Sequence, residues 1–117
     1  MAKPKKTGLR AIRNVIASLR AIDPEMPAQQ VAVLLEVALS PGISQREIAT
    51  RLSISQSAVS RNVNALGERH RKGGDGLELL ETGPFQGTAR GMGPAPTGYH
   101  LTARARHVLG QLEEVSR

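Results

Sequence analysis

The 117-residue sequence has no cysteine and no tryptophan, and it has only one phenylalanine and one tyrosine. Without cysteine the chain can form neither a disulfide nor a thiolate-ligated metal site, a composition that suits the reducing cytoplasm. The scarcity of aromatic side chains leaves little with which to line a small-molecule pocket. We therefore expect a cytoplasmic protein with no cofactor and no small-molecule effector.

Long apolar runs are missing as well, because no stretch approaches the roughly 18 residues that a membrane-spanning helix needs. We expect no membrane partner. The basic start, 1–6, is followed by no uninterrupted apolar core, so no secretory signal is expected. This basic arm is either a frayed terminus or a short segment that reaches phosphates.

Signatures of catalysis are equally scarce. The three histidines are scattered at His70, His100 and His107, and the only aspartates are Asp23 and Asp75. No pair has the spacing of metal ligands, and neither a nucleophile elbow nor a phosphate-binding glycine loop precedes a helix. We expect no enzymatic activity and no metal site.

What the sequence does have is positive charge. Its 16 Lys and Arg against 10 Asp and Glu give a formal net charge of +6, and the isoelectric point is about 10.8. A basic excess on a small domain favours a polyanionic partner, most commonly nucleic acid, although an incidentally basic protein is the alternative. The chain length and a hydrophobic content of 39% suit one domain with a small core.

Apolar residues recur at helical spacing in several regions. A first helix is expected over 7–22, with Thr7 as its cap. Pro27 opens a second helix at its first position, where the missing N–H costs nothing, and the tripeptide SPG ends it. A last helix is expected over 103–116, with Thr102 as its cap.

Between these regions the stretch "ISQREIATRLSISQSAVSRNVNALG" at 43–67 starts two helices in succession. Ser44 and Glu47 form a capping box, in which the hydroxyl accepts a backbone N–H and the carboxylate reaches back to the N–H of the cap. A second helix start follows at Ser55, with Ile54 and Val59 as a hydrophobic staple. Because only about three residues join the two helices, they must cross sharply, so we predict a helix-turn-helix over 44–67.

The chain after this motif has the composition of a hairpin. Short strands are expected over 77–83 and 98–102, and the 16 residues between them, 83–98, hold five Gly and three Pro. Such a segment cannot pack a core and is longer than an ordinary hairpin loop. We therefore predict a two-stranded hairpin with a long tip over 77–102. The residues expected to alternate on one face of the first strand are Leu77, Leu79 and Glu81.

The order helix, helix, helix-turn-helix, hairpin, helix is that of a winged helix-turn-helix domain. Residues 26–66, "MPAQQVAVLLEVALSPGISQREIATRLSISQSAVSRNVNAL", and 99–115, "YHLTARARHVLGQLEEV", resemble the MarR family of bacterial transcription regulators. Ser53 departs from the family pattern, whose turn usually has Gly. The wing has "PFQGTARGMGPAP" in place of the usual Asp-x-Arg run, and the terminal helices are short.

The resemblance implies a mainly α fold with a small β-hairpin wing (α+β), forming one winged helix-turn-helix domain over 1–117. It also implies a homodimer whose recognition helices enter adjacent major grooves of double-stranded DNA, each wing reaching a minor groove. The protein is then expected to be encoded by a prokaryote or a phage and to be associated with the nucleoid. The dimer would use an apolar stripe on the first and last helices. The alternative is that this stripe is buried within the core of the monomer. The stripe comprises Leu9, Ile12, Ile16, Leu19, Leu109, Leu112 and Val115.

The second helix of the motif, expected over 55–67, is two-sided. Val59, Val63 and Leu66 share the side that must face the core, so hydroxyl, amide and guanidinium groups occupy the other. Arginine can grip guanine with two hydrogen bonds, Asn or Gln can do so with adenine, and Ser hydroxyls suit phosphate. The predicted DNA-binding residues are Ser44, Gln45, Ser55, Gln56, Ser57, Ser60, Arg61, Asn64 and Arg90.

Some of these assignments have structural alternatives. For Ser44 the capping role is sufficient by itself, and Arg90 lies in a tip that needs no role at all. His70, Arg71 and Lys72 suit either backbone phosphates or a solvated turn. The sequence thus predicts a sequence-specific DNA-binding regulator, such as a repressor. The alternative is a winged-helix module for protein interaction, architecture or replication, which would need an exposed apolar face.

Overall fold

The computed structural model describes residues 7–67, 76–87 and 96–116, and side chains from Gly8 to Gly110 within those ranges. Arg90, the basic arm and the cluster at 70–72 lie outside the described residues, and so do the side chains of Leu112 and Val115 in the predicted stripe. The helices are α1 (Thr7–Ile22), α2 (Ala28–Leu39), α3 (Gln45–Leu52), α4 (Gln56–Leu66) and α5 (Ala103–Ser116). The strands β1 (Leu80–Gly83) and β2 (Gly98–Leu101) pair antiparallel, with Leu80 opposite Leu101.

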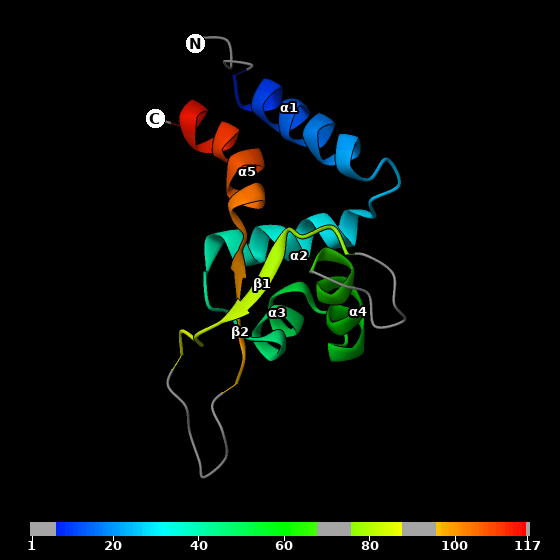
Figure 1. Ribbon diagram of the computed structural model, residues 1–117, viewed down its shortest axis with the longest axis vertical. Coiled ribbons are helices and arrows are strands. Elements are labelled where there is room, and N and C mark those ends of the chain that lie inside the picture. The colour runs from blue at the N-terminus through cyan, green and yellow to red at the C-terminus, as the bar shows by residue number, and fades with distance from the viewer. Residues whose placement is uncertain (1–6, 68–75, 88–95, 117) are drawn as a thin grey trace, which may run out of the picture.

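The helices divide the molecule into two ends (Figure 1). Helices α1 and α5 pack together at one end, α3 and α4 lie at the other, and α2 runs between them. None of the described helices is both long enough and apolar enough to cross a membrane.

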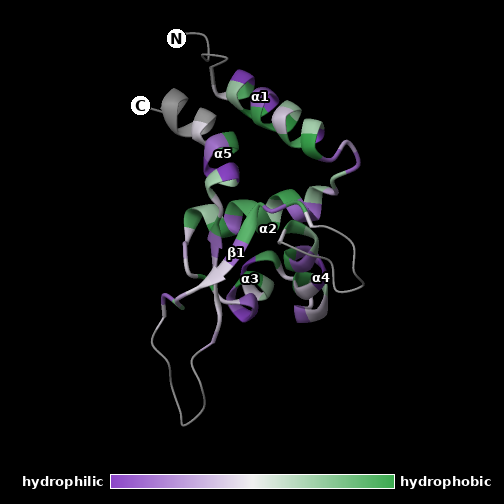
Figure 2. Cartoon of the chain, viewed as in Figure 1, coloured by the Kyte–Doolittle hydropathy of each residue, from purple (hydrophilic) through white to green (hydrophobic). Residues whose placement is uncertain are grey.

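The core forms around α2, which is the most apolar helix (Figure 2). Val33, Leu34 and Val37 of α2 have no exposed surface. They pack in one cluster with residues from every other element, so burial joins the two ends of the molecule through α2. The other fully buried members are Leu19, Ile48, Val59, Leu66, Leu79, Leu80 and Ala105.

The predicted helix-turn-helix is confirmed, with three residues between α3 and α4. Ser53 begins this turn in the left-handed conformation, with φ 54° and ψ 44°. Ser44 and Ser55 are the N-caps of the two helices, as their spacing predicts. The proline prediction is wrong by one residue, because Pro27 is the N-cap of α2, with φ −66°, and Ala28 is its first helical residue.

The first strand is shorter than the sequence predicts. The backbone N–H groups of Leu77, Glu78 and Leu79 donate to the carbonyls of Ala65, Gly67 and Leu66, with N–O distances of 3.0, 2.9 and 2.7 Å. These residues therefore cap the end of α4 instead of extending the hairpin. Glu78 has a positive φ of 58°, which breaks the expected alternation, and the adjacent Leu79 and Leu80 are both buried.

The stem of the hairpin is attached to the turn between α2 and α3. Gly42 N donates to Tyr99 O at 2.8 Å, Tyr99 N donates to Ile43 O at 2.9 Å, and Gln86 N donates to Gly42 O at 3.0 Å. Gly42 has a φ of 88°, a conformation that glycine adopts without steric cost. The hairpin and the helix-turn-helix are thus joined by backbone hydrogen bonds beside the start of α3.

The last helix continues directly from β2 and is anchored at its start. Thr102 Oγ1 accepts from Ala105 N at 3.2 Å, which confirms the predicted cap, and donates to Glu78 O at 2.7 Å. Arg104 and Arg106 donate to the backbone carbonyls of Leu77 and Leu101. These bonds fix the direction in which α5 leaves the hairpin.

Candidate nucleic-acid interface

Helix α4 divides into an inner and an outer face, as its periodicity predicts. Val59, Val63 and Leu66 lie in the core. Gln56, Ser57 and Arg61 are exposed, and Ser60 and Asn64 are partly buried at the edges. Its outer face thus carries an amide, hydroxyls and one guanidinium, and it carries no large apolar side chain.

Asn62 is a residue of α4 that the sequence analysis did not single out. It is only 8% exposed, and its Nδ2 donates to Oε1 of Gln29, near the start of α2, at 2.8 Å. This bond fixes the rotation of α4 about its own axis relative to α2. A signal was available, because Asn62 is three residues from Val59 and four from Leu66, which places it on the inner side.

Gln45 links three elements at the start of α3. Its Nε2 donates to Gln56 O at 3.0 Å, and its Oε1 lies 3.5 Å from the hydroxyl of Tyr99. Burial raises the pKa of the Tyr99 phenol, so the hydroxyl keeps the proton it donates. Gln45 therefore positions the first turn of α4 against the hairpin. Its amide has a second N–H, so the predicted phosphate contact stays a prediction.

The serines at the helix starts act locally. Ser44 Oγ accepts from Glu47 N at 3.2 Å, and Ser55 Oγ accepts from Ala58 N at 3.0 Å while lying 3.1 Å from Ser57 Oγ. The Glu47 carboxylate accepts from Arg51 Nε at 3.2 Å rather than reaching back to Ser44. Only half of the predicted capping box therefore forms.

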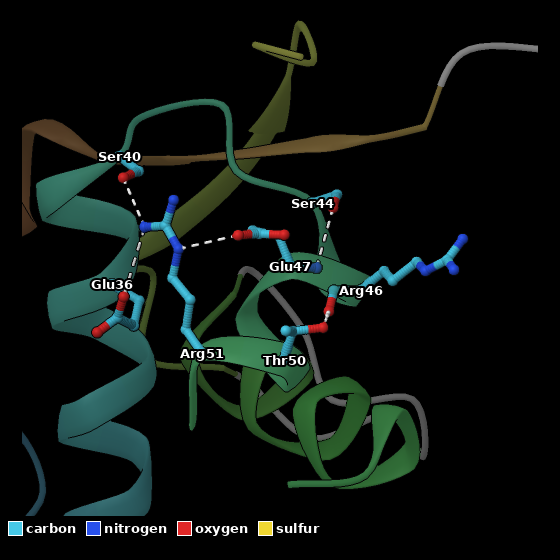
Figure 3. A network of polar contacts seen from close by, with 7 residues as sticks. All are labelled: Glu36, Ser40, Ser44, Arg46, Glu47, Thr50 and Arg51. Carbon is cyan, nitrogen blue, oxygen red and sulfur yellow. Dashed lines mark hydrogen bonds and ion pairs between the residues drawn. The ribbon is translucent and has the colours of Figure 1, made fainter. Parts of the chain in front are cut away.

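Arg51 lies at the centre of a polar network that ties α3 to α2 (Figure 3). Its Nη1 donates to Ser40 Oγ at 2.7 Å and lies 3.6 Å from Glu36 Oε1, while its Nε is held by Glu47. All these partners belong to the protein itself. Arg51 therefore contributes to the packing of the motif, and its charge is already compensated.

A groove of about 480 Å³ lies between α4 and the hairpin. Asn64, Glu81 and Thr82 supply its polar groups, and no cationic side chain of the described residues lines it. The part of the chain that the structure describes has no group of three side chains suited to hold a metal ion.

Two crossed helices in the core, a buried inner face and a hairpin attached beside them define a winged helix-turn-helix domain. A model of the MarR family matches residues 25–69, which run from just before α2 to just after α4. The segment that carries the helix-turn-helix is therefore similar to the MarR family.

A solved structure extends the likeness beyond that segment. The crystal structure of RV1404 from Mycobacterium tuberculosis has 23% sequence identity to this chain and superposes with a TM-score of 0.61. The match covers 94% of this chain and 66% of the other, so the chain spans about two thirds of the length of that protein. At this identity the likeness shows the fold alone. No curated protein matches the sequence.

Proposed function

We propose that this protein is a sequence-specific regulator of transcription, in which a single winged helix-turn-helix domain binds double-stranded DNA. Helix α4 lies in the major groove, and the hairpin lies near the minor groove. The MarR family match over the helix-turn-helix supports DNA binding in general. The observation that carries the proposal is the outer face of α4, where hydroxyl and amide groups surround Arg61 and no large apolar side chain is exposed.

Arg61 is the residue best suited to read a base. It is exposed near the middle of α4, and among the described carboxylates none forms an ion pair with it. A free guanidinium can donate two parallel hydrogen bonds to O6 and N7 of guanine. Gln56 is exposed one and a half turns earlier, where its amide suits adenine. The remaining predicted contacts surround these two side chains.

We further propose that two copies of the chain form a dimer through α1 and α5. Ala11, Val15 and Leu19 of α1 are buried within the protomer, whereas Leu9, Ile12 and Ile16 remain 66%, 52% and 38% exposed. Leu9, Ile12 and Ile16 are therefore not buried in the core of the protomer. An apolar row of this kind is characteristic of an association surface. A symmetric dimer presents two copies of α4, one for each half of a palindromic site.

Replacement of Arg61 tests the proposal. Selection of bound duplex fragments by the wild type defines the preferred site, and Arg61→Ala should lose about 1–3 kcal/mol of discrimination at one base pair per half-site. Arg61→Lys is the matched control, because it keeps the charge but not the planar fork. We expect the lysine variant to retain general DNA affinity and to lose the base preference.

Two outcomes contradict the proposal in different ways. A uniform loss on every sequence would make Arg61 a phosphate contact rather than a base reader. Failure of the wild type to bind any duplex, or binding that is indifferent to salt, would favour a protein-interaction module instead.

A further inference from the structure

The two arginines of α3, Arg46 and Arg51, differ in their side-chain contacts. Arg51 is bound by Glu36, Ser40 and Glu47. Arg46 is exposed, and no side chain of the described residues forms an ion pair or a hydrogen bond with its guanidinium. Figure 3 shows Arg46 extending away from the network that surrounds Arg51. The charge of Arg46 is therefore uncompensated within this part of the protein.

The position of Arg46 connects it to the start of the recognition helix. It follows Gln45 directly, and the amide of Gln45 donates to Gln56 O at 3.0 Å. Arg46 thus begins within one residue of the contact between α3 and α4.

Among the charged side chains of α3, Arg46 is the one left to attract an anion. Glu36, Glu47 and Arg51 together carry one net negative charge and are bound to one another. Arg46 is the remaining charge on the helix. A guanidinium without a carboxylate partner meets phosphate oxygens with charge-assisted hydrogen bonds, without first breaking an ion pair.

We propose that Arg46 binds the phosphate backbone of the duplex and contributes affinity without sequence preference. This inference rests on the proposed function, and it assigns the flanking phosphate contact to a residue that the sequence analysis left out. Arg61 and Gln56 then read bases, while Arg46 and the second N–H of Gln45 lie closest to the adjacent strand.

The test measures the dissociation constant as a function of salt concentration on the preferred site and on a random duplex. Each phosphate contact contributes about −0.9 to the slope of log affinity against log salt. Arg46→Gln should flatten the slope by about one unit per protomer and weaken binding roughly eightfold per lost contact at about 0.1 M salt, equally on both duplexes. Arg46→Lys should restore most of the slope.

Arg10→Gln is the matched control, because Arg10 is exposed on α1 at the far end of the molecule and carries the same charge. It should leave the slope unchanged, which separates a local contact from the effect of net charge. All variants should melt as the wild type does, since neither guanidinium has a partner among the described side chains.

The outcomes separate this inference from the proposed function. If the wild type binds its site and Arg46→Gln leaves the slope unchanged, or changes preference at a single base pair, the phosphate assignment is wrong and DNA binding stands. An equal loss in Arg10→Gln also overturns the assignment, because net charge then explains the effect. If the wild type binds no duplex, both proposals fail together.

Discussion

Ser53 occupies a backbone conformation that its side chain opposes. With φ 54° and ψ 44° it is left-handed, and its N–H donates to carbonyls in the last turn of α3. A non-glycine residue pays about 1–2 kcal/mol for this conformation, because Cβ approaches the carbonyl oxygen. The turn between α3 and α4 therefore stores strain at one exposed residue.

Replacement of Ser53 by glycine should relieve that strain. Ser53→Gly is expected to raise the free energy of unfolding by about 0.5–1 kcal/mol, after the entropic cost of glycine is subtracted. Ser57→Gly is the matched control, since Ser57 is exposed within α4 and the same replacement there should cost about 0.5 kcal/mol. Urea denaturation of the two variants measures both signs. A loss of stability in Ser53→Gly would contradict the argument.

Single residues differ in how far the sequence predicts them. The caps at Ser44 and Ser55 involve partners three residues away, so a local pattern was sufficient. Asn62 and Gln45 have partners 33 and 54 residues distant, Gln29 and Tyr99, and no local pattern contains these contacts. The spacing of Glu47 and Arg51 allows an ion pair within α3, but the contacts of Arg51 with Glu36 and Ser40 are tertiary and no local pattern contains them.

Among the elements, the helices followed from periodicity and the hairpin did so only in part. The first strand was expected from the alternation of leucines, but the carbonyls at the end of α4 need donors, and residues 77–79 supply them. This competition is tertiary and leaves no trace in the spacing of the leucines. The pairing of Tyr99 with Gly42 and Ile43 was likewise not predicted, because it joins segments far apart in the chain.

The stem of the hairpin depends on a close backbone approach at Gly98. A Cβ at this position would collide with the carbonyl oxygen of Pro84 and lie 2.8 Å from that of Gly42. Gly98→Ala should therefore displace the stem from the turn before α3 and cost about 1–3 kcal/mol. Thermal unfolding and hydrogen exchange at Tyr99 and Gly42 measure the stability and the lost pairing.

Gly110→Ala provides the comparison for that experiment. Apart from the backbone of α5 itself, no atom of the described residues lies within 4 Å of a Cβ at Gly110, so alanine there should stabilise the helix by about 0.5–1 kcal/mol. Equal effects of the two replacements would show that Gly98 is not a site of close contact.

For the whole molecule, the sequence predicted an apolar stripe on α1 but not which part the protomer leaves uncovered. The structure shows that Leu9, Ile12 and Ile16 are the uncovered part. Helix periodicity gives the angle between side chains, whereas the direction of the neighbouring helix decides which of them is buried. The separation of this face from α4 by the body of the domain is visible only in the fold (Figure 1).

A charge on this face should separate the proposed dimer. Ile12→Glu is expected to weaken association by about 2–4 kcal/mol, since a carboxylate would be buried without a partner, and to leave the protomer folded. Ala21→Glu is the control, because Ala21 is exposed on α1 and lies about 120° to 180° around the helix from Leu9, Ile12 and Ile16. Size-exclusion chromatography with light scattering measures the mass of each. A wild-type monomer, or an unchanged mass in Ile12→Glu, would contradict the dimer.

The attachment of the hairpin stem to the turn before α3 has a consequence for how an operator is encoded. The backbone bonds at Gly42, Ile43 and Tyr99 join the hairpin stem to the turn before α3, so the parts proposed to contact DNA form a single block in one protomer. In the proposed dimer, the gap between two such blocks depends only on how the far ends of the subunits meet. Under the proposed function, the base sequence of a half-site and the distance between half-sites would therefore be determined by separate regions of this chain, so that mutations could alter one while keeping the other.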